Sequence, residues 1–521
     1  MRTDFSDRFR NRLVGTLKEY DPNQPRDRGG RWSQIRGGGA GPEEDIAPAK
    51  RLPMSWIPSH VTDVSEAIQK AGGRPLLVGG CVRDALMDIR AKDYDLEVYG
   101  LAPDKLEAVL SKLGKVDAVG KSFGILKLTL DDVDLDVSVP RRESKIGAGH
   151  KGFLPKPDPS MTITEASRRR DYTMNSLAMD PFTGDVYDPF GGIKDIKDRV
   201  IRVTDPATFP DDPLRILRGA QFAARFGMEI DEPTKKLCRD IRMTLHELPA
   251  SRVGGEWEKL LFKSDRPSVG LQAMRDLGVL ETLHPDIEKL AGTVQDKKWH
   301  PEGDVFEHTK LVLDEAVKQS KDLSKQDKRD VLYAALMHDI SKPETTEVQP
   351  DGRTTSHGHE KAGEKKARPI LVDQFGLDHA TADRASSLVG NHLAPMMLYQ
   401  RRDEISDSAI RRLAKRIAPA SIEGLAALSR ADNFGRTSSK ALARKSPEVD
   451  WLLSRAKELE VDKEPLKPIL MGRHLISSGL MKPGPAMGRV LGDVFEMQMD
   501  GKVKNEAEAM AAARSLLEET A

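Results

Sequence analysis

The stretch LLVGGCVRDALMDIRAKDYDLEVYG, residues 76–100, decides the fold of the first half of the chain. Its first three residues predict a short buried strand, Gly79 and Gly80 predict a turn, residues 81–89 a helix, and residues 96–99 a second strand. A glycine pair directly after a strand lets the backbone approach phosphate oxygens, and the amides at the start of the next helix favour an anion. We therefore expect a phosphate-binding turn at this point.

Acidic residues follow this turn on two predicted strands. Asp93 and Asp95 are two apart in an extended segment, so both carboxylates are expected on one side of the strand. In VDLDVSV, residues 133–139, apolar residues alternate with Asp134 and Asp136. Three carboxylates on neighbouring strands can hold a pair of Mg²⁺ ions, which activate an attacking hydroxyl and stabilise a leaving pyrophosphate. The pattern predicts nucleotidyl transfer, and solvated strand faces are the alternative interpretation.

The residues around these strands predict a small mixed α/β head with a five-strand-like mixed sheet. Apolar residues at helical spacing predict a helix over 106–113. The segments 124–130 and 133–139 predict a hairpin about Asp131 and Asp132. After about residue 200 the strand patterns end, so the remainder is expected to be helical.

Composition limits the class of protein. A chain of 521 residues is too long for one core, and three or four packed units are expected. Lys plus Arg and Asp plus Glu both number 82, so any RNA-binding face must come from local basic clusters. Cys81 and Cys238 are far apart, which excludes a disulfide framework and fits a reducing cytoplasm. No apolar run approaches the roughly 18–20 residues that span a bilayer, so no membrane partner is expected.

Two further features leave alternatives open. Residues 21–50 are rich in Gly, Pro and charge and predict a disordered arm, which either touches RNA or is a solvated tether. Basic clusters in the helical half either meet RNA phosphates or form solvated helix faces; they are Arg401-Arg402, Arg411-Arg412, Lys415-Arg416 and Lys504.

Most of the histidines lie between residues 296 and 432. Single histidines are usually surface or core groups, but His338 and Asp339 are adjacent at the end of an apolar helix. With His308 upstream and Asp432 downstream, this pair offers imidazole and carboxylate ligands for a divalent metal.

Several of these segments together resemble the bacterial-type CCA-adding tRNA nucleotidyltransferases and their relatives, the bacterial poly(A) polymerases. The resemblance runs from about residue 55 to the C-terminus. The segments that carry it are GGCVRD (79–84), KDYDLEV (92–98), LDVSVPRRE (135–143), RRRDYTMNSLAMDP (168–181), DPFGG (188–192) and DDPLRILRGAQFAARF (211–226).

The resemblance implies roles for residues of the head. Asp93 and Asp95 match the metal-binding carboxylates, and Asp136 matches the third acid better than Asp134. Nucleotide binding is implied for Gly79, Gly80, Arg83, Asp84, Arg170, Asp171 and Asn175. In this scheme Arg83 and Asp84 shape the phosphate site, whereas Arg170 and Asp171 meet the sugar and phosphates of the incoming nucleotide. Asp171 and Asn175 are four apart, so we expect them to share a helix face.

The segment DDPLR implies how a base is chosen without a nucleic-acid template. Asp212 and Arg215 match the pair that reads the Watson–Crick edge of CTP or ATP, since Arg supplies donors and Asp supplies acceptors. Arg218, one turn on, is similar to a residue that meets the triphosphate. Asp211 stands where glutamate is usual, and acids followed by Pro213 also predict a helix start.

The histidine-rich segment resembles the HD phosphohydrolase domain. The matching ligands are His308, His338, Asp339 and Asp432, with His359 and His392 similar to additional cavity histidines. A bound transition metal such as Ni²⁺, Co²⁺ or Mn²⁺ would activate water to hydrolyse phosphate esters. The alternative is a domain that keeps its ligands but serves as an RNA-binding scaffold.

The predicted fold is an α/β head followed by all-α neck, HD and tail domains. The predicted boundaries are an arm (1–52), a nucleotidyltransferase head (53–185), a helical neck (186–290), an HD domain (291–440) and a helical tail (441–521). The predicted function is addition or repair of CCA at the tRNA 3′ end from CTP and ATP with Mg²⁺, in the cytoplasm. The alternatives are a poly(A) polymerase, an enzyme that adds only A or only C, an HD phosphohydrolase whose head merely holds RNA, and an interaction protein recruited through its arm.

Overall fold

The computed structural model describes residues 46–117, 125–130, 133–145 and 153–518. The predicted arm lies almost wholly outside the described residues, as does the turn at Asp131 and Asp132. The chain forms two compact units, one of residues 1–219 with 227–248 and one of residues 220–226 with 249–521.

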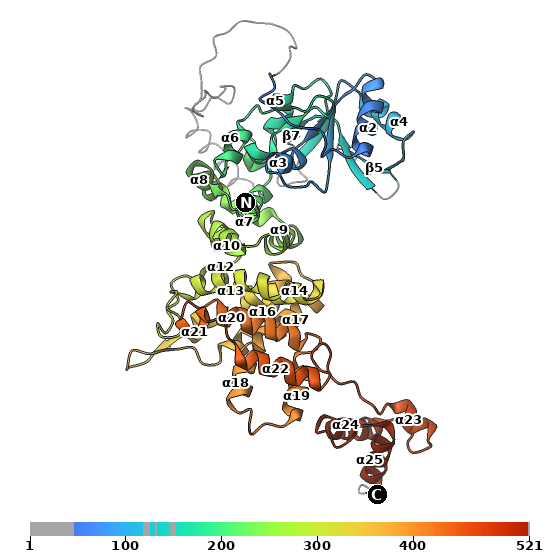
Figure 1. The fold of residues 1–521 in the computed structure, drawn as a ribbon, viewed down its shortest axis with the longest axis vertical. Helices are drawn as coiled ribbons and strands as arrows, with labels where there is room; N and C mark the ends of the chain where they lie inside the picture. Colours follow the sequence, from blue (N-terminus) through green and yellow to red (C-terminus); the bar gives the residue numbers. More distant parts are fainter. Residues whose placement is uncertain (1–45, 118–124, 131–132, 146–152, 519–521) are drawn as a thin grey trace, which may run out of the picture. The chain divides into compact units, whose positions relative to one another are not determined.

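The first unit is built on an eight-stranded sheet of order β1-β10-β9-β2-β3-β6-β5-β4. Strand β5 of this sheet is labelled in Figure 1, in the blue and cyan part of the chain. The strands are β1 (Lys50–Arg51), β2 (Arg74–Val78), β3 (Asp95–Tyr99), β4 (Lys115–Asp117), β5 (Ile125–Leu130), β6 (Val133–Ser138), β9 (Ala178–Met179) and β10 (Asp185–Tyr187). β3 pairs with β6 in parallel and with β2 antiparallel, and β5 pairs antiparallel with β6. The expected five-strand-like sheet was therefore too small. Four strands have only two or three residues, which is too short to show an alternating pattern.

Helices cover both faces of this sheet. On one face α2 (Ser59–Lys70) and α4 (Pro103–Leu110) pack over Leu77, Leu96 and Leu135, which are fully buried. On the other face α5 (Ile163–Arg168) packs over Leu76 and Val78. The alternation of β2 therefore divides its side chains between two apolar layers, as a sheet buried on both faces requires.

Helix α3 (Gly80–Leu86) follows β2 and is shorter than the predicted helix over 81–89. It ends because Asp88 has a φ of 56°, in the left-handed region. Gly79 has a φ of 73°, and a Cβ atom there would lie 2.7 Å from Nη1 of Arg170. Glycine is thus required at position 79 both by backbone conformation and by a close approach.

The rest of the first unit is a series of short elements. They are β7 (Arg141–Lys145), β8 (Phe153–Pro157), η2 (Thr173–Asn175), α6 (Gly192–Lys197), β11 (Val200–Ile201), η3 (Phe209–Asp211), β12 (Glu229–Ile230), α8 (Glu232–Ile241) and η4 (Arg242–Glu247). β11 and β12 pair in parallel, so the expectation of no strands after about residue 200 was wrong. Each has only two residues, which gives no periodic signal.

Helix α7 (Leu214–Phe226) begins later than the acidic start predicted at Asp211. Asp211 belongs to the preceding η3, and Oδ1 of Asp212 accepts a hydrogen bond from the Leu214 amide at 3.2 Å. The acidic residues therefore precede the helix rather than forming its first turn.

The second unit is almost entirely helical. Its elements are α9 (Ala250–Phe262), α10 (Pro267–Asp276), α11 (Val279–Leu283), α12 (Pro285–Glu288), α13 (Val305–Gln319), α14 (Lys325–Met337), α15 (Lys342–Thr345), β13 (Glu347–Val348), β14 (Thr354–Thr355), α16 (His359–Asp373), α17 (His379–Asn391), α18 (Ala394–Gln400), α19 (Asp407–Ile417), α20 (Ile422–Phe434), α21 (Ser439–Leu442), α22 (Pro447–Glu458), α23 (Gly472–Ser477), α24 (Pro485–Met499) and α25 (Glu506–Glu518). The hairpin of β13 and β14 is a second exception to the helical expectation.

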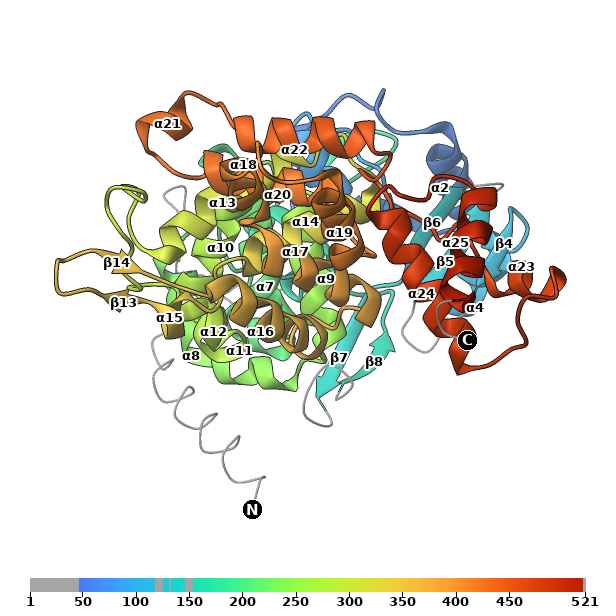
Figure 2. The same cartoon turned by 90° about the horizontal axis from the view of Figure 1, so that it is seen from below.

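Helix α14 lies at the centre of this unit, beside α13, α17 and α20 (Figure 2). Its residues 330–337 are all buried, and residues 331–337 are almost entirely apolar, so the second half of the helix is enclosed on all sides rather than along one stripe. Helices α23, α24 and α25 enclose a separate apolar cluster of their own. Within the described residues, no helix combines the length and the apolar character needed to cross a membrane.

His284 is a fully buried histidine in the second unit. Trp257 donates from Nε1 to Nε2 of His284 at 3.0 Å, and Nδ1 of His284 lies 3.0 Å from Oε1 of Gln374. The ring therefore needs its proton on Nδ1 and accepts at Nε2, which is the neutral form. Burial lowers the pKa of His284 to about 4.

We predict that His284 makes the metal-free protein less stable in mild acid. Between the ordinary pKa of 6.5 and about 4, the unfolded chain binds a proton that the folded chain does not. The free energy of unfolding should therefore fall by about 3 kcal/mol as pH falls through that window. Urea unfolding at several pH values measures this, and His284→Gln, which keeps an acceptor for Trp257, should show a shallower pH dependence. An equal dependence in both proteins would contradict the assignment.

Candidate active sites

Two acidic residues lie side by side at the ends of neighbouring strands. Asp95 is the first residue of β3, and its Cα partner in the parallel pair with β6 is Asp136. Both side chains are exposed, whereas Leu96 and Val137 next to them are fully buried. Although part of the Asp95 side chain is open to solvent, the surrounding protein removes enough solvation to raise its pKa; Arg170 opposes this effect, and Asp136 and Asp93 add to it. Like charges in this position favour a bound cation.

The other two candidate acids are placed differently. Asp93 is exposed but precedes β3, so the argument from strand alternation does not apply to it. Asp93, Asp95 and Asp136 are not among the groups of described residues whose ligand atoms lie within 4.8 Å of one another. Asp134 pairs with side chains of β5: Nζ of Lys127 lies 2.7 Å from its carboxylate, and Oγ1 of Thr129 donates a hydrogen bond to it at 2.7 Å. The strand register therefore places Asp136, and not Asp134, beside Asp95.

Arg83 and Asp84 form a buried pair directly behind the glycine turn. Arg83 is 4% exposed; its Nε donates to Oδ1 of Asp84 at 2.8 Å, and its Nη1 donates to Oδ1 of Asn175 at 2.6 Å. The guanidinium thus ties α3 to η2. This arrangement supports the turn from behind, and the role of the pair in shaping the phosphate site stays a prediction.

Glu97 is a functional residue that the sequence reasoning missed. It is 1% exposed on β3, with Arg169 Nη2 at 3.1 Å, Arg170 Nη2 at 3.6 Å and a hydrogen bond from the Tyr99 hydroxyl at 2.8 Å. Burial alone would raise the pKa of Glu97, but Arg170 and Arg169 outweigh it, so the pKa is lowered. The sequence did carry a signal for Glu97, namely a charged residue inside an otherwise apolar strand. In the structure Glu97 holds Arg170 against Gly79.

Asp171 and Asn175 are in contact, but not for the predicted reason. They do not share a helix, because α5 ends at Arg168 and η2 spans only Thr173–Asn175. Nδ2 of Asn175 donates to Oδ1 of Asp171 at 2.9 Å, and Nε of Arg218 donates to Oδ2 at 2.7 Å. Burial opposes ionisation of Asp171, yet Arg218 and Asn175 lower its pKa. The carboxylate is therefore charged and oriented.

Arg215 lies one turn before Arg218 on α7. Its Nη1 donates to the carbonyl of Thr208 at 2.6 Å, and its Nη2 donates to that of Arg169 at 2.5 Å. Nη1 also donates to the Phe209 carbonyl at 3.5 Å, whereas Nη2 keeps a second hydrogen beyond its bond to Arg169. The structure thus fixes the guanidinium between η3 and the segment after α5.

The four predicted metal ligands of the second unit are brought together from three helical segments. His308 is on α13, His338 and Asp339 directly follow α14, and Asp432 is on α20. His308, His338 and Asp432 form one group whose ligand atoms lie within 4.8 Å of one another, and Asp339, His359 and His392 form a second. Nε2 of His308 lies 3.0 Å from Oδ1 of Asp432 and 3.9 Å from Oδ2 of Asp339.

The histidine rings are oriented by backbone carbonyls. Nδ1 of His338, His359 and His392 lies 2.7–2.8 Å from the carbonyls of Ala335, Ser356 and Val389. Each Nε2 is thereby left as the ligand atom, as in metal sites generally. Nε2 of His338 and Oδ2 of Asp339 are buried without a hydrogen bond, although they are 3.2 Å apart. Buried atoms of this kind fit a divalent metal.

Glu302 and His300 extend this cluster and were missed in the sequence. Oε1 of Glu302 lies 2.9 Å from Nδ1 of both His300 and His308. Although burial opposes it, hydrogen bonds from the two histidines hold the pKa of Glu302 well below its usual range. A carboxylate on Nδ1 of His308 fixes Nε2 toward Asp432. The sequence offered only the polar run HPEGDVFEH as a signal for these two residues, and residues of a loop show no periodic spacing from which a shared face could be predicted.

Two of the four basic residues expected to line an RNA path on α19, Arg412 and Lys415, are paired with acids. Nη2 of Arg412 lies 3.2 Å from Glu496 and 2.8 Å from Asp500, and Nζ of Lys415 lies 3.2 Å from Glu496. Arg411 donates to the carbonyl of Met499 at 3.0 Å. This helix face therefore packs on α24 in the structure.

Three segments of the chain match known families. Residues 76–202 match the poly A polymerase head domain, residues 227–290 the probable RNA and SrmB-binding site of polymerase A, and residues 305–434 the HD domain. Fold and site together define a nucleotidyltransferase of the poly(A) polymerase head class that also carries an HD domain.

Proteins of similar sequence identify the family within this class. The multifunctional CCA protein of Pasteurella multocida is 36% identical over 383 residues, which is 72% of this chain and 87% of the relative. That of Stenotrophomonas maltophilia is 34% identical over 371 residues, 69% of this chain and 86% of the relative. The chain belongs to the family of multifunctional CCA proteins.

Solved structures share the fold at lower identity. The Bacillus stearothermophilus CCA-adding enzyme in complex with CTP has a TM-score of 0.58 at 19% identity, covering 88% of this chain and 98% of that one. The Thermotoga maritima CCA-adding enzyme complexed with tRNA-CCA has a TM-score of 0.55 at 21% identity, covering 89% and 97%.

We predict that Glu302→Ala weakens metal binding in the second unit by about 10- to 100-fold, because His308 loses the carboxylate that orients its ring. Calorimetric titration of metal-free protein with Mn²⁺ or Ni²⁺ measures this. Glu307→Ala is the matched control, since Glu307 is also close to His308 but pairs with Lys310 at 2.7 Å. Equal affinities for the two variants would contradict the role of Glu302.

Proposed function

We propose that the head adds or repairs the CCA end of tRNA, using CTP and ATP without a nucleic-acid template. The observation that carries the proposal is the in-register pairing of Asp95 with Asp136 beside the glycine turn, in a chain of this family. Poly(A) addition and partial A- or C-addition use the same groups. Incorporation of labelled CTP and ATP on tRNAs that end before, within and after CCA distinguishes them.

The reaction is an in-line displacement at the α-phosphorus. The 3′ hydroxyl of the RNA loses its proton, its oxygen bonds to phosphorus, and the bond to the bridging oxygen breaks as pyrophosphate leaves. Asp95 and Asp136, with Asp93 from the preceding loop, would hold Mg²⁺, which when bound stabilises the developing charge. Gly79 leaves room for the triphosphate beside Arg170.

Selection of the nucleotide falls to residues between α5 and α7. Asp171, charged and held by Arg218 and Asn175, accepts a hydrogen bond from the ribose 2′ hydroxyl. Asp212 and Arg215 read the base edge, for which Nη2 of Arg215 keeps a second hydrogen beyond its bond to the Arg169 carbonyl.

The HD domain is proposed to hydrolyse phosphate esters. Its three groups of possible ligands are rich in imidazole, which suits a transition metal such as Ni²⁺, Co²⁺ or Mn²⁺ better than Mg²⁺. When bound, such a metal activates water. We divide the chain accordingly into head (53–185), neck (186–290), HD domain (291–440) and tail (441–521).

Asp136→Ala should reduce nucleotide addition by about a thousandfold. The change removes a carboxylate that holds Mg²⁺, and metal stabilisation of the developing charge is worth several kcal/mol, where about 1.4 kcal/mol is tenfold in rate. Incorporation of CTP and the affinity for tRNA are measured together, and tRNA affinity should change little.

Asp134→Ala is the control for this experiment. Asp134 is on the same strand and the same face but bonds to Lys127 and Thr129, so its loss should leave most of the addition activity. If Asp134→Ala is the more damaging change, the assignment of the third acid is wrong.

The two chemistries should be separable. His338→Ala removes a buried ligand and should abolish metal-stimulated hydrolysis of 2′,3′-cyclic nucleotides, because His338 supplies one of the Nε2 atoms of the cluster. Addition of CTP should be retained, since His338 and Asp95 belong to different compact units. Loss of CTP incorporation by a folded His338→Ala protein would refute independence of the sites.

A further inference from the structure

Tyr172 is a fully buried tyrosine that follows Asp171 in the chain and contacts the start of α7. Its hydroxyl donates a hydrogen bond to the backbone carbonyl of Arg215 at 2.7 Å. Burial raises the pKa of Tyr172 well above its ordinary value, so the hydroxyl stays protonated and remains a donor. Tyr172 therefore bonds to the main chain of the residue whose side chain is proposed to read the base.

The ring of Tyr172 also contacts the segment that precedes α7. It packs edge-on against Phe209 of η3, with the ring centroids 5.6 Å apart, and Phe209 is itself buried. Because η3 ends at Asp211, the next residue is Asp212, the proposed partner of Arg215. One buried side chain thus touches the elements on both sides of Asp212, η3 through its ring and α7 through its hydroxyl.

The position of Tyr172 depends on the absence of a side chain at position 219. Gly219 lies in the middle of α7, and a Cβ atom on it would be 2.3 Å from Oη of Tyr172 and 3.0 Å from Cζ. A ring with no exposed surface has no open space into which it could move aside. Glycine inside a helix is otherwise less favourable than alanine. Helix α7 therefore has a less favourable residue at the point that the Tyr172 hydroxyl occupies.

Two neighbours of Tyr172 in the chain hold side chains of α7. The carbonyl of Arg169 accepts from Nη2 of Arg215 at 2.5 Å, and Oδ2 of Asp171 accepts from Nε of Arg218 at 2.7 Å. Tyr172 adds a contact of another kind, because it bonds to the main chain of α7. Groups that recognise a substrate must be held within about 0.5 Å of their working position. A bond to the carbonyl of Arg215 fixes the point from which its side chain extends.

We propose that Tyr172 is a positioning residue for base selection. With Gly219 leaving room for its hydroxyl, Tyr172 sets the place from which Arg215 presents its guanidinium to the incoming nucleotide. Tyr172 acts through Arg215, since its own ring and hydroxyl are buried in the protein. This role rests on the nucleotide addition proposed for the head, and it adds a residue that determines which nucleotide is accepted.

Discrimination between CTP and UTP measures this role. The kcat/KM for incorporation of each nucleotide is determined on a tRNA that lacks CCA, with the full chain as wild type and as Tyr172→Phe. The ratio of the CTP value to the UTP value should fall about three- to tenfold in Tyr172→Phe, because one buried hydrogen bond is lost. The fraction of folded enzyme cancels in this ratio, so a merely structural role would leave it unchanged. An unchanged ratio overturns the proposal.

Two further variants test the pairing of Tyr172 with Gly219. Gly219→Ala places a Cβ atom against the hydroxyl and should lower the ratio further than Tyr172→Phe does. Combining Gly219→Ala with Tyr172→Phe removes the obstructing hydroxyl, so the ratio should return to that of Tyr172→Phe alone. A combined loss equal to the product of the two single losses would refute the pairing. If Gly219→Ala does not fold, the comparison of Tyr172→Phe with the wild type still decides.

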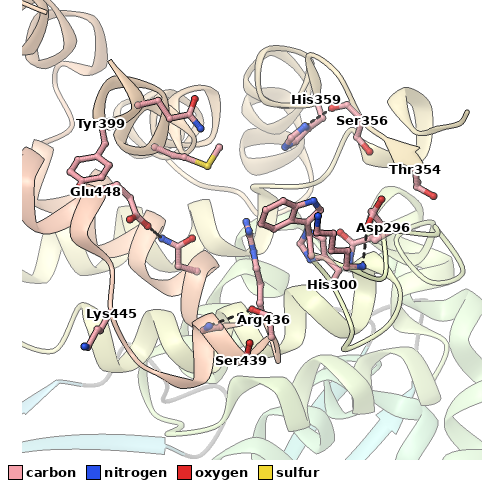
Figure 3. A pocket seen from close by; sticks show the side chains of 18 of the residues that line it. Asp296, His300, Thr354, Ser356, His359, Tyr399, Arg436, Ser439, Lys445 and Glu448 are labelled. Atoms are coloured by element: carbon pink, nitrogen blue, oxygen red, sulfur yellow. Dashed lines mark hydrogen bonds between the residues drawn. The ribbon is translucent and has the colours of Figure 1, made fainter. Parts of the chain in front are cut away.

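Two matched changes elsewhere in the chain serve as controls. Gly492→Ala introduces alanine into α24, where a Cβ atom would meet nothing within 4 Å. Tyr399→Phe removes a tyrosine hydroxyl in the second unit, where Tyr399 lines a cavity (Figure 3). Both variants should keep the wild-type ratio. A loss in either as large as that in Tyr172→Phe would contradict the assignment to Tyr172.

A binding measurement separates this role from the function of the head. If the wild type incorporates neither CTP nor ATP, the proposed nucleotide addition fails. Equilibrium dialysis of the full chain with CTP and with UTP, in the presence of Mg²⁺, then decides the role of Tyr172. The wild type should bind CTP more tightly than UTP, and Tyr172→Phe should narrow that difference. An equal difference in both proteins overturns the proposal.

Discussion

The parallel pairing of β3 with β6 is the constraint on which the head depends. Its register places Asp95 opposite Asp136, and a slip of one residue would turn these carboxylates into the apolar layer. That register is set by Leu96 and Val137, which are fully buried beneath the sheet face. Packing of apolar side chains therefore decides where the charge is placed, and the resulting repulsion between carboxylates favours a divalent cation.

A chain of buried charges joins this site to α7. Glu97 holds Arg169 and Arg170, while Asp171 holds Arg218 and is itself held by Asn175. Removing one partner from such a pair leaves an uncompensated buried charge, which typically costs about 3–5 kcal/mol. These contacts add little stability in themselves, but they orient the groups that meet a nucleotide.

The second unit has the opposite requirement, because its candidate ligand atoms can bind a metal only if protein hydrogen bonds do not occupy them. Helix α14 is buried on all sides, so its end holds His338 and Asp339 in the interior with little freedom. Backbone carbonyls take the Nδ1 protons, and Glu302 takes that of His308. Among the atoms that remain, Nε2 of His338 and Oδ2 of Asp339 are buried without a hydrogen bond.

The sequence by itself determined the longer strands, the glycine turn, the helical second half and the candidate ligands, because each leaves a local pattern of alternation, spacing or residue type. It did not determine the eight-stranded sheet, since strands of two or three residues have no period. Strand alternation could not separate Asp134 from Asp136, because both lie on the same face; the resemblance favoured Asp136, and only the register of the tertiary structure places that residue beside Asp95. The same holds for Glu97 and Glu302, whose roles come from partners that are distant in sequence or on the far side of a loop. The local sequence pattern indicates which face of a strand or helix a residue occupies, whereas the packing of the whole unit determines which residue it contacts.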